Sequence, residues 1–160
     1  MTIIIRPMRE GEAEQVAQMV HAIAEYVGSS TVPKLTGAKL MNAADLIDTA
    51  VAEEAGQLLG ACLGLMTYST WRACRGLYVV DLFVTPDARG RHLGRDLLRF
   101  QARRFAERGA RFLKLEVDES NVRAEAFYAR LGFVKKAEDR LHVLEQDEFN
   151  NFVAMGEHTT

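Results

Sequence analysis

Three strand-like stretches in succession, between residues 49 and 84, constrain the fold of this chain most. They cover residues 49–53, 57–70 and 76–84, and only Glu54, Ala55 and Gly56 separate the first from the second. A break of that length is typical of a β-hairpin, so these stretches predict neighbouring strands of one sheet.

Patterns on either side of this run add helices to the sheet. Apolar residues recur at helical spacing over residues 11–27 and 93–108, and shorter helices are expected at about 38–46, at 121–131 and from 147. Further strands are expected at 3–5, 112–117, 133–136 and 140–144. This order predicts an α+β fold with helices on both faces of the sheet, within a single domain that spans residues 1–160.

Composition narrows the possible partners. The chain has 160 residues, the usual size of one domain, and a formal net charge of −2. This charge offers no bulk attraction to nucleic acid or to a membrane surface, and no apolar run approaches the roughly 18 residues that span a bilayer. Cys62 and Cys74 have no histidine cluster near them in the sequence, so no metal site is predicted. Two thiols suit a reducing compartment, and we expect a cytoplasmic protein.

A glycine-containing turn joins the strand that ends at Val84 to the helix that begins near Leu93. The first turn of a helix leaves about four backbone N–H groups unpaired and carries partial positive charge. Gly90 and Gly94 let the backbone approach an anion, and three side chains add full charges: Arg89, Arg91 and Arg95. The turn predicts a diphosphate site, with a solvated basic helix end as the alternative. The GxGxxG and GxxxxGK[ST] patterns of other nucleotide sites are absent.

Residues 89–94, Arg-Gly-Arg-His-Leu-Gly, resemble the acyl-CoA pyrophosphate loop of the GNAT superfamily of N-acetyltransferases, [RQ]-x-x-G-x-[GA]. They depart from it at the fourth position, where His92 replaces the usual glycine but still offers a backbone N–H. The resemblance implies the GNAT fold, whose central sheet is mixed and mostly antiparallel, and acetyl-CoA as cosubstrate without a metal. It implies that acetyl-CoA is bound by Leu82, Phe83 and Val84, by Arg89, Gly90, Arg91, His92, Leu93, Gly94 and Arg95, and by Asn121 and Tyr128.

A second segment, residues 121–133, carries the other half of the resemblance. Its end, Phe-Tyr-Ala-Arg-Leu-Gly-Phe at 127–133, is similar to the FYxxLGF signature of the family. Asn121, Ala124 and Tyr128 share one face of the expected helix. A helical tyrosine is by itself usually a packing residue, but here the resemblance implies that Tyr128 protonates the leaving thiolate. Its phenol, with an ordinary pKa of about 10, is protonated at pH 7.

The stretch 77–84, with Trp71 before it and residues 144–149 near the end, looks most like the diamine (spermidine/spermine) acetyltransferase branch. That branch implies a homodimer and a polyamine-like or related amine as acceptor. Its members carry a Glu-Asp pair where this chain has Val80 and Asp81, so one acid is missing.

Acetyl transfer needs a neutral amine, a polarised thioester carbonyl and a proton for the thiolate. Asp81 is expected to act as base or amine anchor, with a structural hydrogen-bond acceptor as the alternative. The backbone N–H of Leu82, at a bulge in the strand 76–84, is expected to polarise the carbonyl. Three further residues are candidates for substrate binding, with a solvated strand face or an ordinary helix end as alternatives: Glu116, Glu25 and Tyr26.

These features predict an acetyl-CoA-dependent N-acetyltransferase that acts on the primary amine of a small cationic molecule (a diamine, polyamine or lysine-like compound) by direct attack in a ternary complex. Two alternatives stay open: a protein lysine or N-terminal acetyltransferase, and a non-catalytic acyl-CoA-binding sensor. Val80 in place of an acid favours the sensor, whereas Tyr128 favours the enzyme.

Overall fold

The structure is a computed structural model that describes residues 2–155 of the chain. Contacts between residues divide the chain into two compact units, one up to Ala126 and one from Phe127 onward. The boundary falls inside one helix, α4 (Val122–Arg130). The two units are described separately below.

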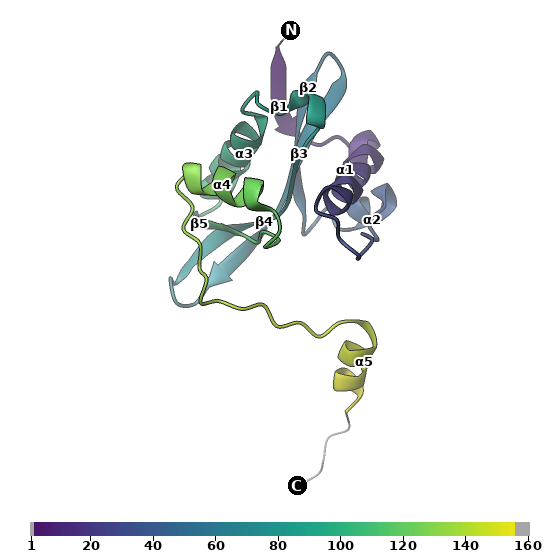
Figure 1. Cartoon of the computed structure of the whole chain (residues 1–160), viewed down its shortest axis with the longest axis vertical. Helices are drawn as coiled ribbons and strands as arrows, with labels where there is room; N and C mark the ends of the chain where they lie inside the picture. Colours follow the sequence, from purple (N-terminus) through teal and green to yellow (C-terminus); the bar gives the residue numbers. More distant parts are fainter. Residues whose placement is uncertain (1, 156–160) are drawn as a thin grey trace. The chain divides into compact units, whose positions relative to one another are not determined.

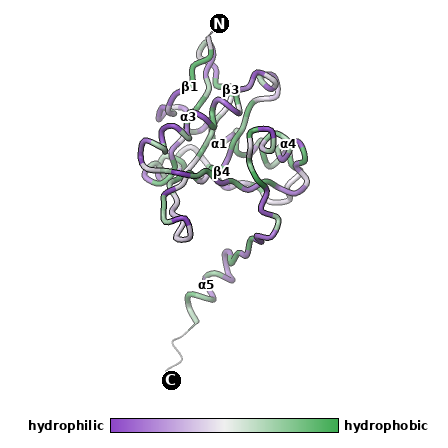
Figure 2. The backbone as a smooth tube through the Cα atoms, turned by 90° about the vertical axis from the view of Figure 1, so that its left-hand side faces the viewer, coloured by the Kyte–Doolittle hydropathy of each residue, from purple (hydrophilic) through white to green (hydrophobic). Residues whose placement is uncertain are grey.

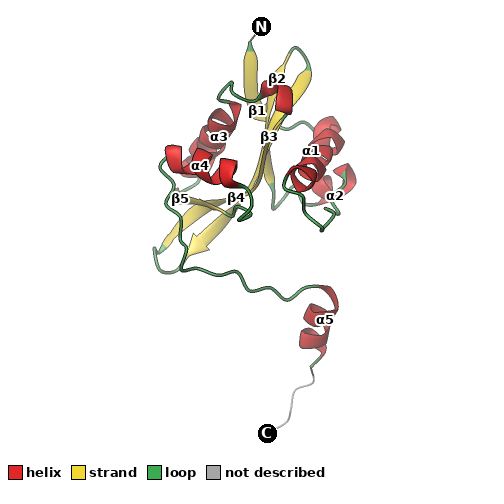
Figure 3. Cartoon of the chain, viewed as in Figure 1, coloured by secondary structure: helices red, strands yellow, loops and turns green. Residues whose placement is uncertain are grey.

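The first unit is built on a five-stranded sheet with the strands in sequence order (Figure 3). The strands are β1 (Ile3–Pro7), β2 (Asp48–Glu54), β3 (Gln57–Ser69), β4 (Cys74–Val84) and β5 (Ala110–Leu115). Neighbours from β1 to β4 pair antiparallel, with short connections from β2 to β3 and from β3 to β4, and β5 pairs parallel to β4 after the crossover through α3. The prediction of a mixed, mostly antiparallel sheet is confirmed.

Helices cover both faces of this sheet (Figure 1). The helix α1 (Ala13–Tyr26) and the short α2 (Gly37–Asn42) lie on one face, and α3 (Leu93–Glu107) lies on the other. Single 3-10 turns at Glu10–Glu12 and Pro86–Ala88 precede α1 and α3. The helix expected at 38–46 ends at Asn42, because the residues that follow form a turn into β2.

The sheet buries apolar side chains against each helix layer, and hydrophobic residues follow β3 and β4 through the centre of the unit (Figure 2). On the α1 face, Val16 and Met19 pack with Ala61 and Leu63 of β3. On the α3 face the side-chain amide of Gln101 is fully buried, and it donates to the backbone oxygens of Asp48 and Cys62 over 2.9 and 3.1 Å. These bonds satisfy a polar group that would otherwise destabilise the core.

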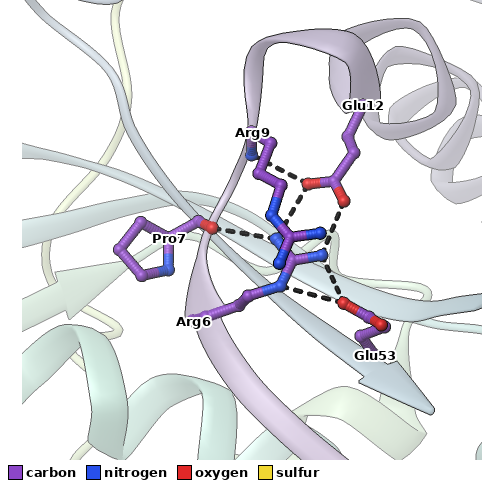
Figure 4. Close-up of polar contacts among 5 residues, drawn as sticks. All are labelled: Arg6, Pro7, Arg9, Glu12 and Glu53. Carbon is purple, nitrogen blue, oxygen red and sulfur yellow. Dashed lines mark hydrogen bonds and ion pairs between the residues drawn. The ribbon is translucent and has the colours of Figure 1, made fainter. Parts of the chain in front are cut away.

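An ion network at Arg6 fixes the start of the sheet (Figure 4). The guanidinium donates to Glu12, in the 3-10 turn, over 2.9 Å and to Glu53, on β2, over 2.9 Å. Glu12 also accepts from the backbone N–H of Arg9 over 2.8 Å. The hydrogen bonds from Arg6 hold the pKa of Glu12 and of Glu53 below the ordinary value of a glutamate. One side chain thus ties β1 to its neighbouring strand and to the turn before α1.

The second unit contains the end of α4, a turn at Leu131–Phe133 and the helix α5 (Gln146–Ala154). Gly132, with φ of +94°, allows the reversal after α4, and the N–H of Phe133 donates to the oxygen of Tyr128 over 3.1 Å. The prediction of strands at 133–136 and 140–144 is wrong, because these residues form no regular secondary structure. Runs of four or five residues specify a strand only when a neighbouring strand accepts their backbone hydrogen bonds.

Candidate active site

The turn before α3 has the backbone geometry of an anion site. Gly90 has φ of +80° and His92 has φ of +63°, so both adopt the left-handed conformation that glycine favours. In the described part of the chain, the backbone N–H groups of Leu93, Gly94 and Arg95 have no hydrogen-bond partner. These groups open a helix of 15 residues, where the helix dipole adds partial positive charge. They fit the diphosphate of acetyl-CoA.

His92 therefore occupies the conformation for which the family pattern uses glycine. It is exposed, and as the N-cap residue of α3 it makes no side-chain capping hydrogen bond. A side chain in this conformation is strained by about 1–2 kcal/mol relative to the right-handed region. Because the imidazole lies in solvent, this strain comes from the backbone conformation and not from packing of the ring.

Two of the three arginines of the turn are held by carboxylates. Arg91 donates to the Glu54 carboxylate, on the β2–β3 hairpin, over 2.8 and 3.1 Å, and this bond lowers the pKa of Glu54. Arg95 donates to its neighbour Asp96 over 2.9 Å. Such exposed pairs contribute at most about 1 kcal/mol, so a diphosphate can compete for the guanidinium groups.

Arg89 contacts the end of the first helix instead. Its Nε donates to the backbone oxygen of Val84 over 3.2 Å, and its guanidinium carbon lies 4.7 Å from the centre of the Tyr26 ring. Tyr26, which we expected on the substrate side, is thus placed against the turn, and Glu25 beside it is exposed. The cation–π contact links α1 to the turn, a link that the sequence did not indicate.

A β-bulge in β4 decides the direction of Asp81. Leu63 pairs with Asp81 while the next residue, Gly64, pairs with Val79, so Val80 is the extra residue. Without the bulge Val79 and Asp81 would point to the same face of the sheet. With it, Asp81 shares the face of Leu63, which is the face that α1 covers.

The same register leaves one edge of β4 open. The N–H of Thr85 donates to the oxygen of Leu59, and since bonded pairs alternate along antiparallel strands, Phe83 also faces β3 while Leu82 and Val84 face away. On that side β5 pairs with β4 only as far as Val79. The N–H of Leu82 therefore lies on an edge to which no described strand bonds, where it can donate to a thioester carbonyl.

Asp81 is half-buried and has no hydrogen bond or ion pair with any described side chain. Burial raises the pKa of this carboxyl above the ordinary value of an aspartate. A carboxylate that loses solvent without gaining a cation can take up the proton or the positive charge of a ligand.

The charges of Asp81 and Glu116 both act on Tyr78. We expected Glu116 on a strand that ends at residue 117, but β5 ends at Leu115, and Glu116 is the first residue after it. Burial raises the pKa of the Tyr78 hydroxyl, and the charge and hydrogen bonding of Glu116 and the charge of Asp81 raise it further. Tyr78 was missed by the sequence analysis, because only the bulge places residues 78 and 81 on one face.

Asn121 directly precedes α4, and Tyr128 lies within it. The side-chain oxygen of Asn121 accepts from the N–H of Ala124 over 3.2 Å, so Asn121 caps the helix. Tyr128 belongs to the second unit, where its ring lies 5.1 Å from that of Phe127 and 5.3 Å from that of Phe133. Its role as the general acid stays a prediction that rests on the FYxxLGF resemblance.

A cavity of about 470 Å³ is lined by residues of α1, of the β2–β3 hairpin and of β4. Its lining is mostly amide and apolar: Gln15, Gln18, Met19, Ala22, Gly56, Gln57, Leu58 and Phe83. It contains no titratable side chain, so it does not compete with Asp81 as the reacting centre.

Within residues 2–155, no three His, Cys, Asp or Glu side chains are grouped as metal ligands, and no helix is long and apolar enough to cross a membrane. Cys62 is buried and Cys74 half-buried, and both are free, as expected. Burial raises the pKa of Cys62 to about 12, so this thiol is not a nucleophile at neutral pH.

Comparison with known proteins agrees with this geometry. Residues 22–133 match the acetyltransferase (GNAT) family. The chain is 25% identical over 142 residues to a thialysine N-epsilon-acetyltransferase of Bos taurus, covering 81% of this chain and 83% of that protein. It is 40% identical over 78 residues to a streptothricin acetyltransferase of Streptomyces lavendulae, covering 49% of this chain and 39% of that protein.

The fold has a counterpart among solved structures. An integron cassette protein of V. cholerae superposes with a TM-score of 0.78 over 96% of this chain and 99% of that one, at 18% identity. At that identity the likeness concerns the fold. The α+β sheet with its two helix layers is thus found in both proteins.

Proposed function

Since the chain belongs to the acetyltransferase (GNAT) family and is an acetyl-CoA-dependent N-acetyltransferase, we propose that its acceptor is the primary amine of a small cationic molecule: a diamine, a polyamine or a lysine-like compound. The amine attacks directly in a ternary complex. Asp81 carries this proposal, because its carboxylate is half-buried, has no cation partner and has a raised pKa. Such a group favours a positively charged ligand.

The binding of acetyl-CoA is assigned to the open edge of β4 and to the turn. Leu82 and Val84 direct their backbone groups to the edge, with Phe83 between them. The unpaired N–H groups of residues 93–95 and Gly90 hold the diphosphate, and Arg89, Arg91, His92 and Arg95 surround it. The resemblance adds Asn121 and Tyr128 to this set. Glu25 and Tyr26 are proposed as acceptor-side residues near the start of the turn, since Tyr26 contacts Arg89.

The reaction needs each proton to be accounted for. Asp81, directly or through a water, takes the proton that makes the amine neutral. The nitrogen then attacks the thioester carbon, and the Leu82 N–H stabilises the negative charge on the carbonyl oxygen. The carbon–sulfur bond breaks, and Tyr128 gives a proton to the thiolate. The nitrogen loses its second proton as the amide forms, and that proton restores the phenol of Tyr128, directly or through solvent. The products are the acetylated amine and free CoA thiol.

The relatives support the amine class by their names. One acts on thialysine, at an ε-amine, and the other on streptothricin. We extend the proposal to a homodimer on the basis of the diamine acetyltransferase resemblance. From the net charge, the short apolar runs and the two cysteines, we also propose a cytoplasmic protein without a metal, nucleic acid or membrane partner. Sedimentation equilibrium of the full chain tests the dimer, since a monomer at micromolar concentration contradicts it.

An acceptor screen tests the proposed substrate class. Thiol release from acetyl-CoA is measured at pH 7 to 9 with diamines, polyamines, lysine, neutral amines, acidic amines and a lysine-containing peptide. We expect the cationic small amines to have the highest kcat/KM. A preference for the peptide supports a protein acetyltransferase instead, and binding of acetyl-CoA without turnover on any acceptor supports a sensor.

A further inference from the structure

The face of the sheet around the end of β4 gathers side chains that are separated in the sequence. Tyr78 lies opposite Leu65 and Asp81 opposite Leu63, and these two residues of β3 point to the same face. The extra residue Val80 makes this possible, because it shifts Asp81 onto the face of Tyr78. A tyrosine and a carboxylate thus stand side by side along one strand.

The neighbouring strand adds two charged groups to the same face. Lys114 pairs with Tyr78 in the parallel register, and its Nζ lies 5.2 Å from the centre of the Tyr78 ring. Glu116 follows two residues later on that face, just beyond Leu115, where β5 stops pairing with β4. The carboxylates of Asp81 and Glu116 therefore flank the point at which the two strands separate.

The side chain of Tyr78 interacts with charged groups of both signs, Lys114 at its ring and Glu116 at its hydroxyl. It holds the Lys114 ammonium by a cation–π contact, and Glu116 makes no ion pair with any described lysine or arginine. Hydrogen bonding with the Glu116 carboxylate is one of the causes that raise the pKa of the Tyr78 hydroxyl. Since the hydroxyl can donate and a carboxylate only accepts, Tyr78 is the donor in this contact.

We infer that Tyr78 is a positioning and specificity-determining residue of the acceptor site. Its hydroxyl holds Glu116 so that Glu116 and Asp81 together select acceptors with a second positive charge. Asp81 receives the reacting amine, and Glu116 receives the distal ammonium. This inference rests on the proposed function and assigns to Tyr78 a part in it that no sequence motif indicates.

The test compares two acceptors of equal carbon length, 1,4-diaminobutane and n-butylamine. For wild type we expect the higher kcat/KM with the diamine. Tyr78→Phe should lower the diamine/monoamine ratio of kcat/KM about tenfold, mainly through KM of the diamine, since a hydrogen bond to a charged group is lost. Glu116→Gln should lower this ratio by a similar factor. The variant that carries both substitutions should lower it little further, because each substitution removes the same interaction between Tyr78 and Glu116.

Matched controls separate positioning from general damage. Tyr68→Phe removes a hydroxyl from an exposed tyrosine of β3, and Glu119→Gln removes an exposed carboxylate beyond β5. Neither should change the ratio. The inference is overturned if Tyr78→Phe lowers kcat/KM for both acceptors by the same factor. It is also overturned if a control variant changes the diamine/monoamine ratio as much as Tyr78→Phe does. If wild type acetylates neither of these two amines nor any amine of the acceptor screen, but binds acetyl-CoA, the proposed function fails, and the inference fails with it.

Discussion

The turn assigned to the diphosphate and the face assigned to the acceptor amine differ in how they are built. The turn consists of consecutive residues, 89–95, whose backbone conformation at Gly90 and His92 exposes the first N–H groups of α3. The acceptor face combines Tyr78, Asp81 and Glu116 from β4 and the residue after β5, and it depends on one inserted residue. A site made of neighbours in the chain is visible in a sequence, whereas a site made across strands depends on register.

This difference predicts that each region can be removed without the other. Gly94→Glu puts bulk and negative charge on the unpaired N–H groups of the turn, so acetyl-CoA binding should be lost. At about a hundred times its dissociation constant, acetyl-CoA should stabilise wild type by about 2.7 kcal/mol, and this thermal shift should vanish in the variant.

The control for this change is Gly11→Glu. A Cβ at Gly11 meets no atom within 4 Å, so the variant should fold and keep the shift with acetyl-CoA. Retention of the shift by Gly94→Glu would falsify the assignment of the turn.

A residue of the second unit tests whether the two regions suffice for catalysis. Tyr128→Phe should lower kcat about 100-fold, since loss of a general acid typically costs a factor of 10² or more. The dissociation constant of acetyl-CoA should change little. Stopped-flow turnover and calorimetric binding measure the two quantities, and an unchanged kcat returns Tyr128 to a packing role beside Phe127 and Phe133.

Asp81→Asn separates activity from stability on the acceptor face. Because burial raises the pKa of Asp81, the charged form opposes folding at neutral pH, and folding becomes more favourable as the pH falls through the raised pKa. Asparagine removes this cost, so the free energy of unfolding should rise by about 0.5 kcal/mol or more. The change is measured as a higher midpoint of denaturant unfolding.

The same variant should lose about tenfold or more in kcat/KM for cationic amines, with a flatter pH profile of kcat. Acetyl-CoA binding should match that of wild type, which keeps the two regions distinct. A variant that is less stable and fully active would show that Asp81 is a structural hydrogen-bond acceptor.

The smallest effect is expected at His92. Since its φ of +63° suits glycine, His92→Gly should raise the free energy of unfolding by about 0.5–1 kcal/mol. His92→Ala is the control, because alanine keeps the left-handed strain and should give no gain. Urea unfolding measures both variants, and equal gains would mean that the imidazole, and not the backbone, is the cause.

Much of the fold followed from periodicity. The strands 49–53, 57–70 and 76–84 correspond to β2, β3 and β4, and the long helices to α1 and α3. The strands expected at 133–136 and 140–144 did not form, because a short alternating run carries no information about which edge accepts it. Tail segments therefore limited the prediction more than the core did.

By itself the sequence determined the position of the turn that we assign to the diphosphate, because glycines, arginines and a helix start that follow one another act through local backbone conformation. Only the tertiary structure decided which residues share the face that we propose for the acceptor. One residue, Val80, reverses the side on which Asp81 lies and so brings it to Tyr78 and Glu116. The physical reason is that side chains alternate along a strand with a period of two, so the register between strands, which no local pattern encodes, chooses the face.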